Sequence, residues 1–201
     1  MSQPKIVCVL NKSETYDWDY VEKLQRGIAK QLKEFEFVTL YGSRWPRWWA
    51  KMELFDPHLT GDILYFDLDT VIVGPIDDLL VPRLPVVLAD FNLPRPNFMA
   101  TGVMWLPEYM RIHVWRDWIA NPALHMQKHA SHGDGGFLSR YFKAGALRWQ
   151  DLIPGQIVSY KLHCKDGVPQ GARVVCFHGN PRPRSVNWEV GKTLCSSSAS
   201  R

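Results

Sequence analysis

Two aspartates, Asp67 and Asp69, follow the short apolar run Ile63 to Phe66. This run is rich in β-branched and aromatic residues and is bounded by turn formers, which predicts a buried strand. Residues two apart in an extended chain point to the same side, so both carboxylates can face one ion. Paired hard oxygen ligands suit Mg²⁺ or Mn²⁺, with phosphate oxygens and water completing the coordination. The carboxyl edge of a strand is also where open α/β sheets bind ligands.

The setting of this pair distinguishes two interpretations. Asp-x-Asp often arises by chance, and its aspartates are then solvated turn residues. The apolar run before the pair and Val71-Ile72-Val73 after it favour a metal or phosphate site instead.

A second group of reactive side chains follows a predicted strand at 172–177. His178 and Gly179 begin the loop, and Arg182 and Arg184 come next among prolines. An arginine binds phosphate through the planar fork of its guanidinium. The loop therefore suits a third metal ligand accompanied by phosphate donors.

Three other residues, Lys51, Asp134 and Tyr16, each have two interpretations. Lys51 is expected either to bind a phosphate at the carboxyl edge of the sheet or to be exposed to solvent, as most lysines are. Asp134 is the N-cap of a helix over 133–142 or an acid facing a ligand, and the cap is the favoured role. Tyr16 stacks on a nucleobase or packs on the core. Asp90 ends a predicted strand at 85–90.

Three histidines, His125, His129 and His132, have helical spacing. On one helix face they could hold a metal. Gly133 ends this run, and an exposed helix face is the favoured interpretation.

The elements that position these residues predict an α/β fold. A strand at 4–10, a helix within 17–34 and a strand at 36–41 open a parallel sheet with crossover helices. Residues 101–106 predict a further strand, and residues 147–150 and 156–160 weaker ones. Helices are expected at 47–55, with Trp48, Met52 and Phe55 on one face, and at 107–120.

Composition limits the class of protein. The chain has 201 residues, 46% hydrophobic and 22% charged, which predicts one soluble globular domain. The net charge of +4 fits an anionic ligand without indicating nucleic acid. Nine tryptophans suggest that some line a groove. No signal peptide or membrane-spanning stretch is evident, and four cysteines without CxxC spacing favour a reducing cytoplasmic location.

The Asp-x-Asp segment, Tyr-Phe-Asp-Leu-Asp-Thr-Val-Ile-Val-Gly-Pro-Ile-Asp, resembles that of GT-A nucleotide-sugar glycosyltransferases. The nearest type is glycosyltransferase family 8, or glycogenin-like. Other segments agree in order: the first strand with Tyr16, 49–52, 101–104, 133–138 and 177–183. The resemblance implies a single GT-A domain at 1–194, Rossmann-like with a mostly parallel sheet. The Ser-rich tail at 195–201 is expected to be disordered.

The resemblance also implies a site. Mn²⁺ (or Mg²⁺) would be held by Asp67, Asp69 and His178, and Asp134 or Asp90 would stabilise a cation-like sugar. A nucleotide-sugar donor, UDP-linked, would transfer its sugar with retention of configuration. The residues expected to bind this donor are Leu10, Asn11, Tyr16, Lys51, Asp67, Leu68, Gly179, Arg182 and Arg184.

The sequence departs from the family at several positions. Ala100 replaces the usual Asn, and Gly135 and Gly136 replace Gln and Asp. Strict alignment puts Cys176 in the third metal position. We expect His178 there, because imidazole suits Mn²⁺ better than a thiol does.

Two other functions remain open at this stage. A haloacid-dehalogenase-type phosphatase would use Asp67 as nucleophile, and a non-catalytic module would bind the nucleotide-sugar without turnover. The acceptor is equally open, whether a saccharide, a glycolipid, a protein or a modified nucleic acid. Residues 43–55 and 94–97 either form its groove or are edges of the fold.

Overall fold

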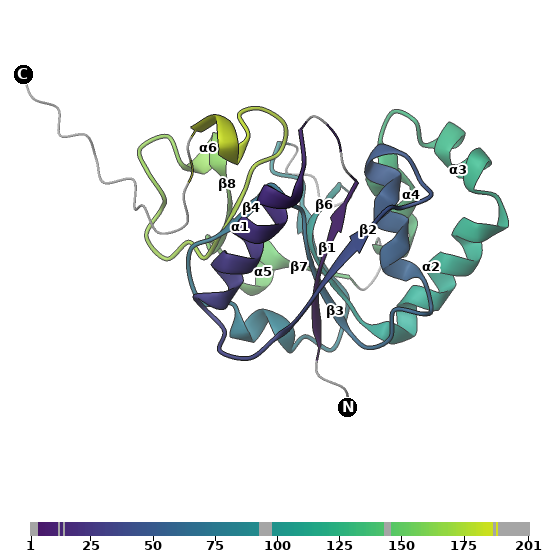
Figure 1. Ribbon diagram of the computed structural model, residues 1–201, viewed down its shortest axis with the longest axis horizontal. Helices are drawn as coiled ribbons and strands as arrows, with labels where there is room; N and C mark the ends of the chain where they lie inside the picture. The colour runs from purple at the N-terminus through teal and green to yellow at the C-terminus, as the bar shows by residue number, and fades with distance from the viewer. Residues whose placement is uncertain are drawn as a thin grey trace, which may run out of the picture.

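A computed structural model describes residues 4–11, 13, 15–92, 98–142, 146–186 and 188. Its central sheet has six strands in the order β2-β1-β3-β6-β5-β7 (Figure 1). The strands are β1 (Lys5–Leu10), β2 (Glu36–Tyr41), β3 (Ile63–Phe66), β5 (Val86–Ala89), β6 (Met99–Leu106) and β7 (Leu147–Arg148). Strand β6 runs antiparallel to β3 and β5, whereas the other pairs are parallel. The predicted α/β fold with a mostly parallel sheet is confirmed.

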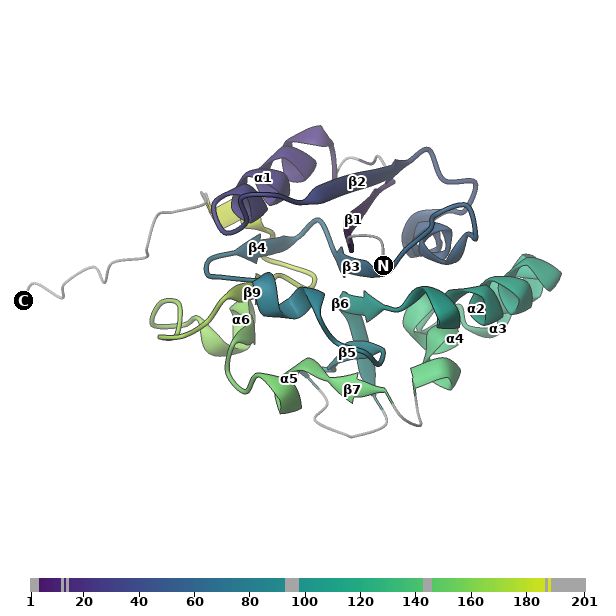
Figure 2. The same ribbon diagram turned by 90° about the horizontal axis from the view of Figure 1, so that it is seen from below.

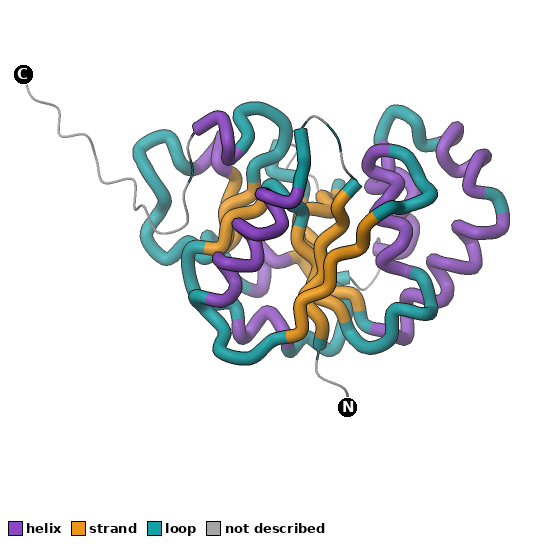
Figure 3. The backbone as a smooth tube through the Cα atoms, in the orientation of Figure 1, coloured by secondary structure: helices purple, strands orange, loops and turns teal. Residues whose placement is uncertain are grey.

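The alternation of side chains along β1 shows how both faces of this sheet are covered. Ile6, Cys8 and Leu10 pack into one core. Val7 and Val9 point to the opposite face and join the other core. Helix α1 (Trp18–Ala29) covers the first face, while α2 (Glu108–Ala120) and α4 (Gly133–Phe142) lie over the second (Figure 3).

A second sheet carries the late part of the chain to the aspartate pair. It consists of β4 (Thr70–Ile72), β9 (Val174–Cys176) and β8 (Ile157–Ser159), and lies to one side of the central sheet (Figure 2). Thr70 pairs with Cys176 in the antiparallel ladder of β4 and β9. The Phe177 N–H donates to the Asp69 carbonyl at 2.9 Å. This pairing places the loop that begins at His178 beside the Asp-x-Asp segment.

The segment Arg47–Phe55 is a 3₁₀ helix, η1, so the prediction that Trp48 shares a face with Met52 and Phe55 was wrong for Trp48. Three residues per turn align Trp49, Met52 and Phe55, and all three are buried. The same repeat puts Trp48 and Lys51 on another face, where both line the main cleft. The tighter helix thus turns Trp48 out of the core.

The three histidines do not share one helix face. Helix α3 (Pro122–Lys128) ends before His129, and a turn precedes α4. His125 is buried, with its Nε2 at 2.9 Å from the Asp117 carbonyl, so the expectation of an exposed face was wrong for this residue. Across the described ranges, no three His, Cys, Asp or Glu side chains gather as metal ligands.

The remaining short elements are η2 (Asp77–Leu80), α5 (Trp149–Leu152), α6 (Tyr160–His163) and η3 (Pro183–Val186). Cys8, Cys164 and Cys176 are buried free thiols. Within the described part of the chain, no helix is both long and apolar enough to cross a bilayer. The predictions for 94–97 and for the tail 195–201 concern residues outside the described ranges.

Arg111 of α2 ties down the segment that connects η1 to β3. Its guanidinium donates to the carbonyls of Leu54 at 3.0 Å, Leu59 at 2.6 Å and Gly61 at 2.6 Å, and burial lowers its pKa. Arg111→Met leaves these acceptors unsatisfied and should lower the free energy of unfolding by about 3 kcal/mol in urea titrations. The exposed Arg116→Met on the same helix should change it by less than about 0.5 kcal/mol. Equal effects of the two would contradict this role.

Candidate functional site

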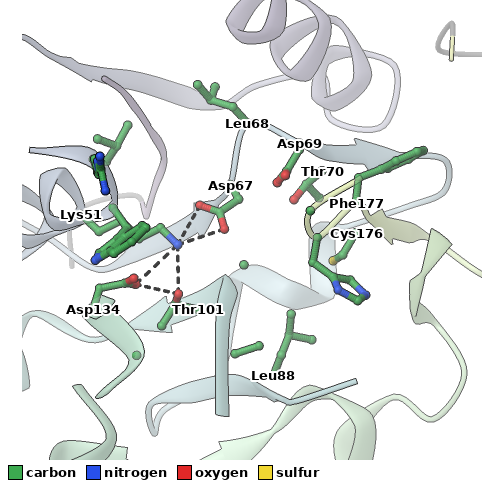
Figure 4. A pocket seen from close by; sticks show the side chains of 18 of the residues that line it. Lys51, Asp67, Leu68, Asp69, Thr70, Leu88, Thr101, Asp134, Cys176 and Phe177 are labelled. Atoms are coloured by element: carbon green, nitrogen blue, oxygen red, sulfur yellow. Dashed lines mark hydrogen bonds and ion pairs between the residues drawn. The ribbon is translucent and has the colours of Figure 1, made fainter. Parts of the chain in front are cut away.

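A cleft of about 950 Å³ opens at the carboxyl ends of β1 and β3. Segments from η1, β6, α4 and the loop after β9 contribute to its walls. Asp67, Asp69, Lys51, Thr101 and Asp134 all line it (Figure 4). Residues distant in sequence therefore converge at the edge where the aspartate pair was predicted to act.

Asp67 is fixed by its own strand and by the neighbouring strand. Its backbone N–H donates to the Gly102 carbonyl of β6 at 2.8 Å. The Tyr65 hydroxyl donates to its Oδ1 at 2.5 Å, because residues two apart lie on the same side of an extended chain. Burial, followed by the charge of Asp67, raises the pKa of Tyr65 well above its usual value. Tyr65 therefore remains a protonated donor to the carboxylate.

Lys51 joins two acids across the cleft. Its Nζ lies 3.0 Å from Asp67 Oδ2, 3.5 Å from Asp134 Oδ2 and 2.9 Å from Thr101 Oγ1. Burial alone would lower the pKa of Lys51, but Asp134 and Asp67 raise it above its ordinary value. The ammonium is thus charged, and its side chain is only 13% exposed. Lys51 is a site residue and not a solvated lysine.

Asp134 faces the cleft. The Thr101 hydroxyl donates to its Oδ2 at 2.7 Å, and the residue is 7% exposed. Its carboxylate bonds the side chains of Thr101 and Lys51, so the favoured N-cap interpretation gives way to the alternative of a ligand-facing acid. Figure 4 shows Lys51 between Asp67 on one side and Asp134 with Thr101 on the other.

Asp69 forms a second group with Tyr16 and Arg182. The Tyr16 hydroxyl donates to Asp69 Oδ2 at 2.8 Å, and the Arg182 guanidinium bonds both groups. Burial and the neighbouring Asp67 raise the pKa of Asp69 to about 6 despite Arg182. The ring of Tyr16 lies under Arg182, at 5.1 Å from centroid to guanidinium carbon. Each aspartate of the pair thus has one cation as its partner, Lys51 for Asp67 and Arg182 for Asp69.

Other predicted donor-binding residues lie in different settings. Asn11 lines the cleft, and its Nδ2 donates to the Arg47 carbonyl at 3.2 Å. Leu10 and Leu68 bury their side chains in a core. Leu68 also borders the cleft, whereas Leu10 lies outside its lining.

Arg184 lies outside the cleft lining. It pairs with Asp17 at 2.7 Å and Asp19 at 3.1 Å at the start of α1. The bond to Asp17, followed by that to Asp19, raises the pKa of Arg184. Arg182, two residues earlier, is the arginine that reaches the aspartates.

The predicted metal ligands are only partly brought together. His178 Nε2 lies 2.6 Å from Ser159 Oγ, and its ring stacks on Phe91 with centroids 5.6 Å apart. Burial, followed by the positive charge of Lys161, lowers the pKa of His178, so the imidazole is neutral. Cys176 is a buried thiol whose pKa burial raises, which makes it a poor thiolate ligand.

Asp90 also lines the cleft, where its Oδ1 accepts from the Asn92 backbone N–H at 2.8 Å. Gly179, with φ of 78°, borders the same space. These two residues belong to the His178 side of the cleft, since Asp90 acts electrostatically on that imidazole. The aspartate pair itself fits a divalent ion, because its carboxylates supply the hard oxygens that suit Mg²⁺ or Mn²⁺.

Thr101 and Tyr65 are cleft residues for which the sequence predicted no role in ligand binding, and Trp48 was considered only as part of the segment 43–55 that could form an acceptor groove. Tyr65 could have been found from its period-two relation to Asp67. Thr101 required the pairing of β3 with β6, which brings a strand from later in the chain beside the aspartates. The position of Trp48 in the cleft lining depended on the three-residue repeat of the 3₁₀ helix.

Comparisons with known proteins identify the fold. No family model and no curated protein matches the sequence. The galactosyltransferase LgtC, solved with donor and acceptor sugar analogs, superposes with a TM-score of 0.67 at 12% identity, over 89% of this chain and 88% of LgtC. The chain has the GT-A fold. Glycosyltransferase GlyE of Streptococcus pneumoniae TIGR4 gives 0.66 at 12% identity, and a glycosyltransferase that acts in glycosylation of the PBCV-1 major capsid gives 0.59 at 14%.

The lengths of these GT-A proteins differ. The match covers 90% of this chain but only 56% of the GlyE chain. With the PBCV-1 protein it covers 91% of this chain and 96% of the other.

The raised pKa of Asp69 predicts pH-dependent metal binding. A divalent ion binds the ionised carboxylate, and in the metal-free protein this group takes up a proton near pH 6. Mn²⁺ affinity should therefore level off above that pH and fall by up to about tenfold per unit below it. Calorimetry from pH 5 to 8 measures this dependence. A flat profile, or the same slope in Asp69→Asn, would contradict it.

Proposed function

We propose that this protein is a metal-dependent glycosyltransferase that moves a sugar from a UDP-sugar donor to an acceptor. The observation that carries the proposal is the pair Asp67 and Asp69 at the carboxyl edge of β3, flanked by Lys51 and Arg182. Two acids between two cations suit a bound metal diphosphate, whose charges can replace these internal pairs. The GT-A fold, which this chain shares with the glycosyltransferases LgtC and GlyE, supports the same function.

Asp67 and Asp69 would hold Mn²⁺ or Mg²⁺. His178 does not gather with them in this structure, and it would have to leave its bond to Ser159 to serve as the third ligand. When bound, the ion would act as a Lewis acid that offsets the charge of the departing diphosphate. Arg182 supplies fixed positive charge at the same place through its guanidinium fork. Tyr16 holds Asp69 and Arg182 in position through its hydroxyl. In this arrangement Asn11 and Tyr16, which line the cleft at the end of β1, are the candidates for contact with the nucleoside.

Lys51 and Asp134 lie on the side where the sugar would bind. Asp134 is held by Thr101 and Lys51, so it is suited to orient a sugar and stabilise its positive charge. Asp90 is a second carboxylate in the cleft for this purpose. An acid already paired with a lysine is a weak general base, and this favours retention of configuration over inversion.

The transfer itself balances without a protein nucleophile. The acceptor oxygen bonds to the anomeric carbon while the bond from that carbon to the diphosphate oxygen breaks. The acceptor's hydroxyl proton passes to the departing diphosphate oxygen. The residues named above bind, orient and balance charge during this exchange.

A panel of UDP-sugars tests the proposed function through slow hydrolysis in which water is the acceptor. We expect UDP release from at least one donor with Mn²⁺ and none after chelation. The protein would instead be a phosphatase if no donor is cleaved and if it hydrolyses a generic phosphomonoester in a reaction that requires Asp67. UDP binding without turnover of any donor would instead indicate a binding module.

Arg182 and Arg184 form a matched pair for a further prediction. Arg182→Ala should weaken UDP binding by about 10- to 100-fold, because a charge-assisted contact to phosphate is lost. Arg184→Ala removes the pairs with Asp17 and Asp19 and the contact with the Tyr20 ring, all outside the cleft lining, and should change UDP affinity by less than about twofold. Calorimetry with UDP and Mn²⁺ measures both. Equal losses would show that Arg184 also reaches the donor.

A further inference from the structure

Trp48 is an aromatic side chain in the cleft that the proposed donor chemistry does not use. It is 42% exposed, although most of the other described tryptophans are more deeply buried. The indole packs directly on the backbone of Gly133, where a Cβ would lie 2.7 Å from its Nε1. Gly133 has φ of 59°, so both conformation and space require glycine there. The first turn of α4 therefore supports one part of the indole, while the side chain borders open cleft.

Gly135 opens the cleft beside this tryptophan. It lines the same cavity, and a Cβ built on it meets nothing within 4 Å. Its backbone is compatible with other residues, and glycine is a weaker helix former than alanine. By contrast, a Cβ at Gly136 would lie 2.8 Å from His132 Cβ. Packing against His132 thus explains the glycine at position 136. At position 135 no packing requires glycine, and the missing side chain leaves open space next to Asp134.

The groups around this space combine an aromatic surface with polar side chains. Arg47, His132 and Asp134 line the cleft together with Trp48 and Gly135. Arg47 has φ of 52°, uncommon for a residue with a side chain, and Asn11 bonds its carbonyl at 3.2 Å. A sugar ring presents apolar C–H faces and hydroxyls at its rim. An indole face bordered by hydrogen-bonding groups is complementary to both features.

We propose that Trp48 and Gly135 form the acceptor subsite and that the acceptor is a saccharide. One pyranose ring packs against the indole above Gly135, and a hydroxyl of that ring is directed toward the donor sugar near Asp134. This inference rests on the proposed function and adds the class of acceptor to it. A lipid tail or an apolar peptide would fit poorly, since Arg47, whose guanidinium carbon lies 6.0 Å from the centroid of the Trp48 ring, and Asp134 line the cleft with this indole.

Fluorine NMR of protein labelled with 5-fluorotryptophan tests the subsite directly. Methyl glycosides of glucose, galactose and N-acetylglucosamine serve as probes in the presence of UDP and Mn²⁺. The Trp48 resonance, assigned by its loss in Trp48→Phe, should shift with at least one glycoside. Trp18, exposed to a similar 45% but outside the cleft lining, should not shift. No shift of Trp48, or an equal shift of Trp18, would overturn the inference.

Substitutions at Gly135 and Trp48 supply the second test. Gly135→Leu should abolish the Trp48 shift by filling the open space, while Gly135→Ala should retain it. Trp48→Ala should raise the KM for the responding glycoside about tenfold or more, and Trp18→Ala should leave it unchanged. UDP affinity, measured on each variant, separates the two proposals. If the wild type binds UDP but no glycoside shifts the Trp48 resonance, only the acceptor subsite is refuted. If the wild type does not bind UDP at all, the proposed function is refuted.

Discussion

Asp69→Ala is expected to eliminate metal-dependent UDP binding and to lower donor turnover by about 10³-fold or more. Asp69 is one of two carboxylates that would hold the ion, and it also anchors Tyr16 and Arg182. Removing this carboxylate leaves Arg182 without its acidic partner. The positive guanidinium cannot take the place of carboxylate oxygens as a metal ligand. Initial rates with the best UDP-sugar, together with calorimetry in Mn²⁺, measure the two losses.

Asp77→Ala is the matched control for this substitution. Asp77 is an exposed aspartate at the start of η2, a few residues along the chain from the pair. Its replacement should leave UDP affinity and turnover within about twofold, as expected for a surface substitution. Asp69→Asn preserves the side-chain shape and should fail as Asp69→Ala does, since an amide lacks the required charge. An active Asp69→Asn would show that no ion is held there.

Lys51→Met is expected to destabilise the fold by about 3–5 kcal/mol and to stop turnover. Lys51 lies between Asp67 and Asp134, and its side chain is 13% exposed. Without the ammonium, two largely buried carboxylates face each other uncompensated. Urea unfolding monitored by circular dichroism gives the change in free energy of unfolding.

Two variants sharpen this prediction. Lys23→Met removes an exposed i,i+4 pair with Asp19 and should change stability by less than about 0.5 kcal/mol. Adding Asp134→Asn to Lys51→Met should recover part of the lost stability, because the Asp134→Asn substitution removes the charge of a buried acid. A loss below about 1 kcal/mol in Lys51→Met would mean that solvent reaches these acids freely.

The sheet could be predicted from sequence because its signals are local. β3 and its two aspartates followed from one apolar run and the period of two. β1, α1 and β2 followed from a β-α-β pattern whose buried positions repeat regularly. Each of these elements is specified by residues that are close in sequence.

The parts that escaped prediction depend on helix type or on distant contacts. Trp48 was expected to share a helix face with Met52 and Phe55, but the 3₁₀ helix places it on a different face, which borders the cleft. His125 became buried because α3 folds back onto Asp117 of α2. Arg184 and Arg182 are equivalent in sequence, and only the position of α1 assigns the first to Asp17 and the second to Asp69. Such choices are made by tertiary packing.

The central claim is that Asp67 and Asp69 form a metal-dependent diphosphate site, and calorimetric titration of UDP with and without Mn²⁺ tests it most directly. The expected result is saturable binding of UDP with Mn²⁺ present and at least about tenfold weaker binding after chelation. Binding that is equally strong without metal, or no binding of UDP with Mn²⁺, would contradict the claim.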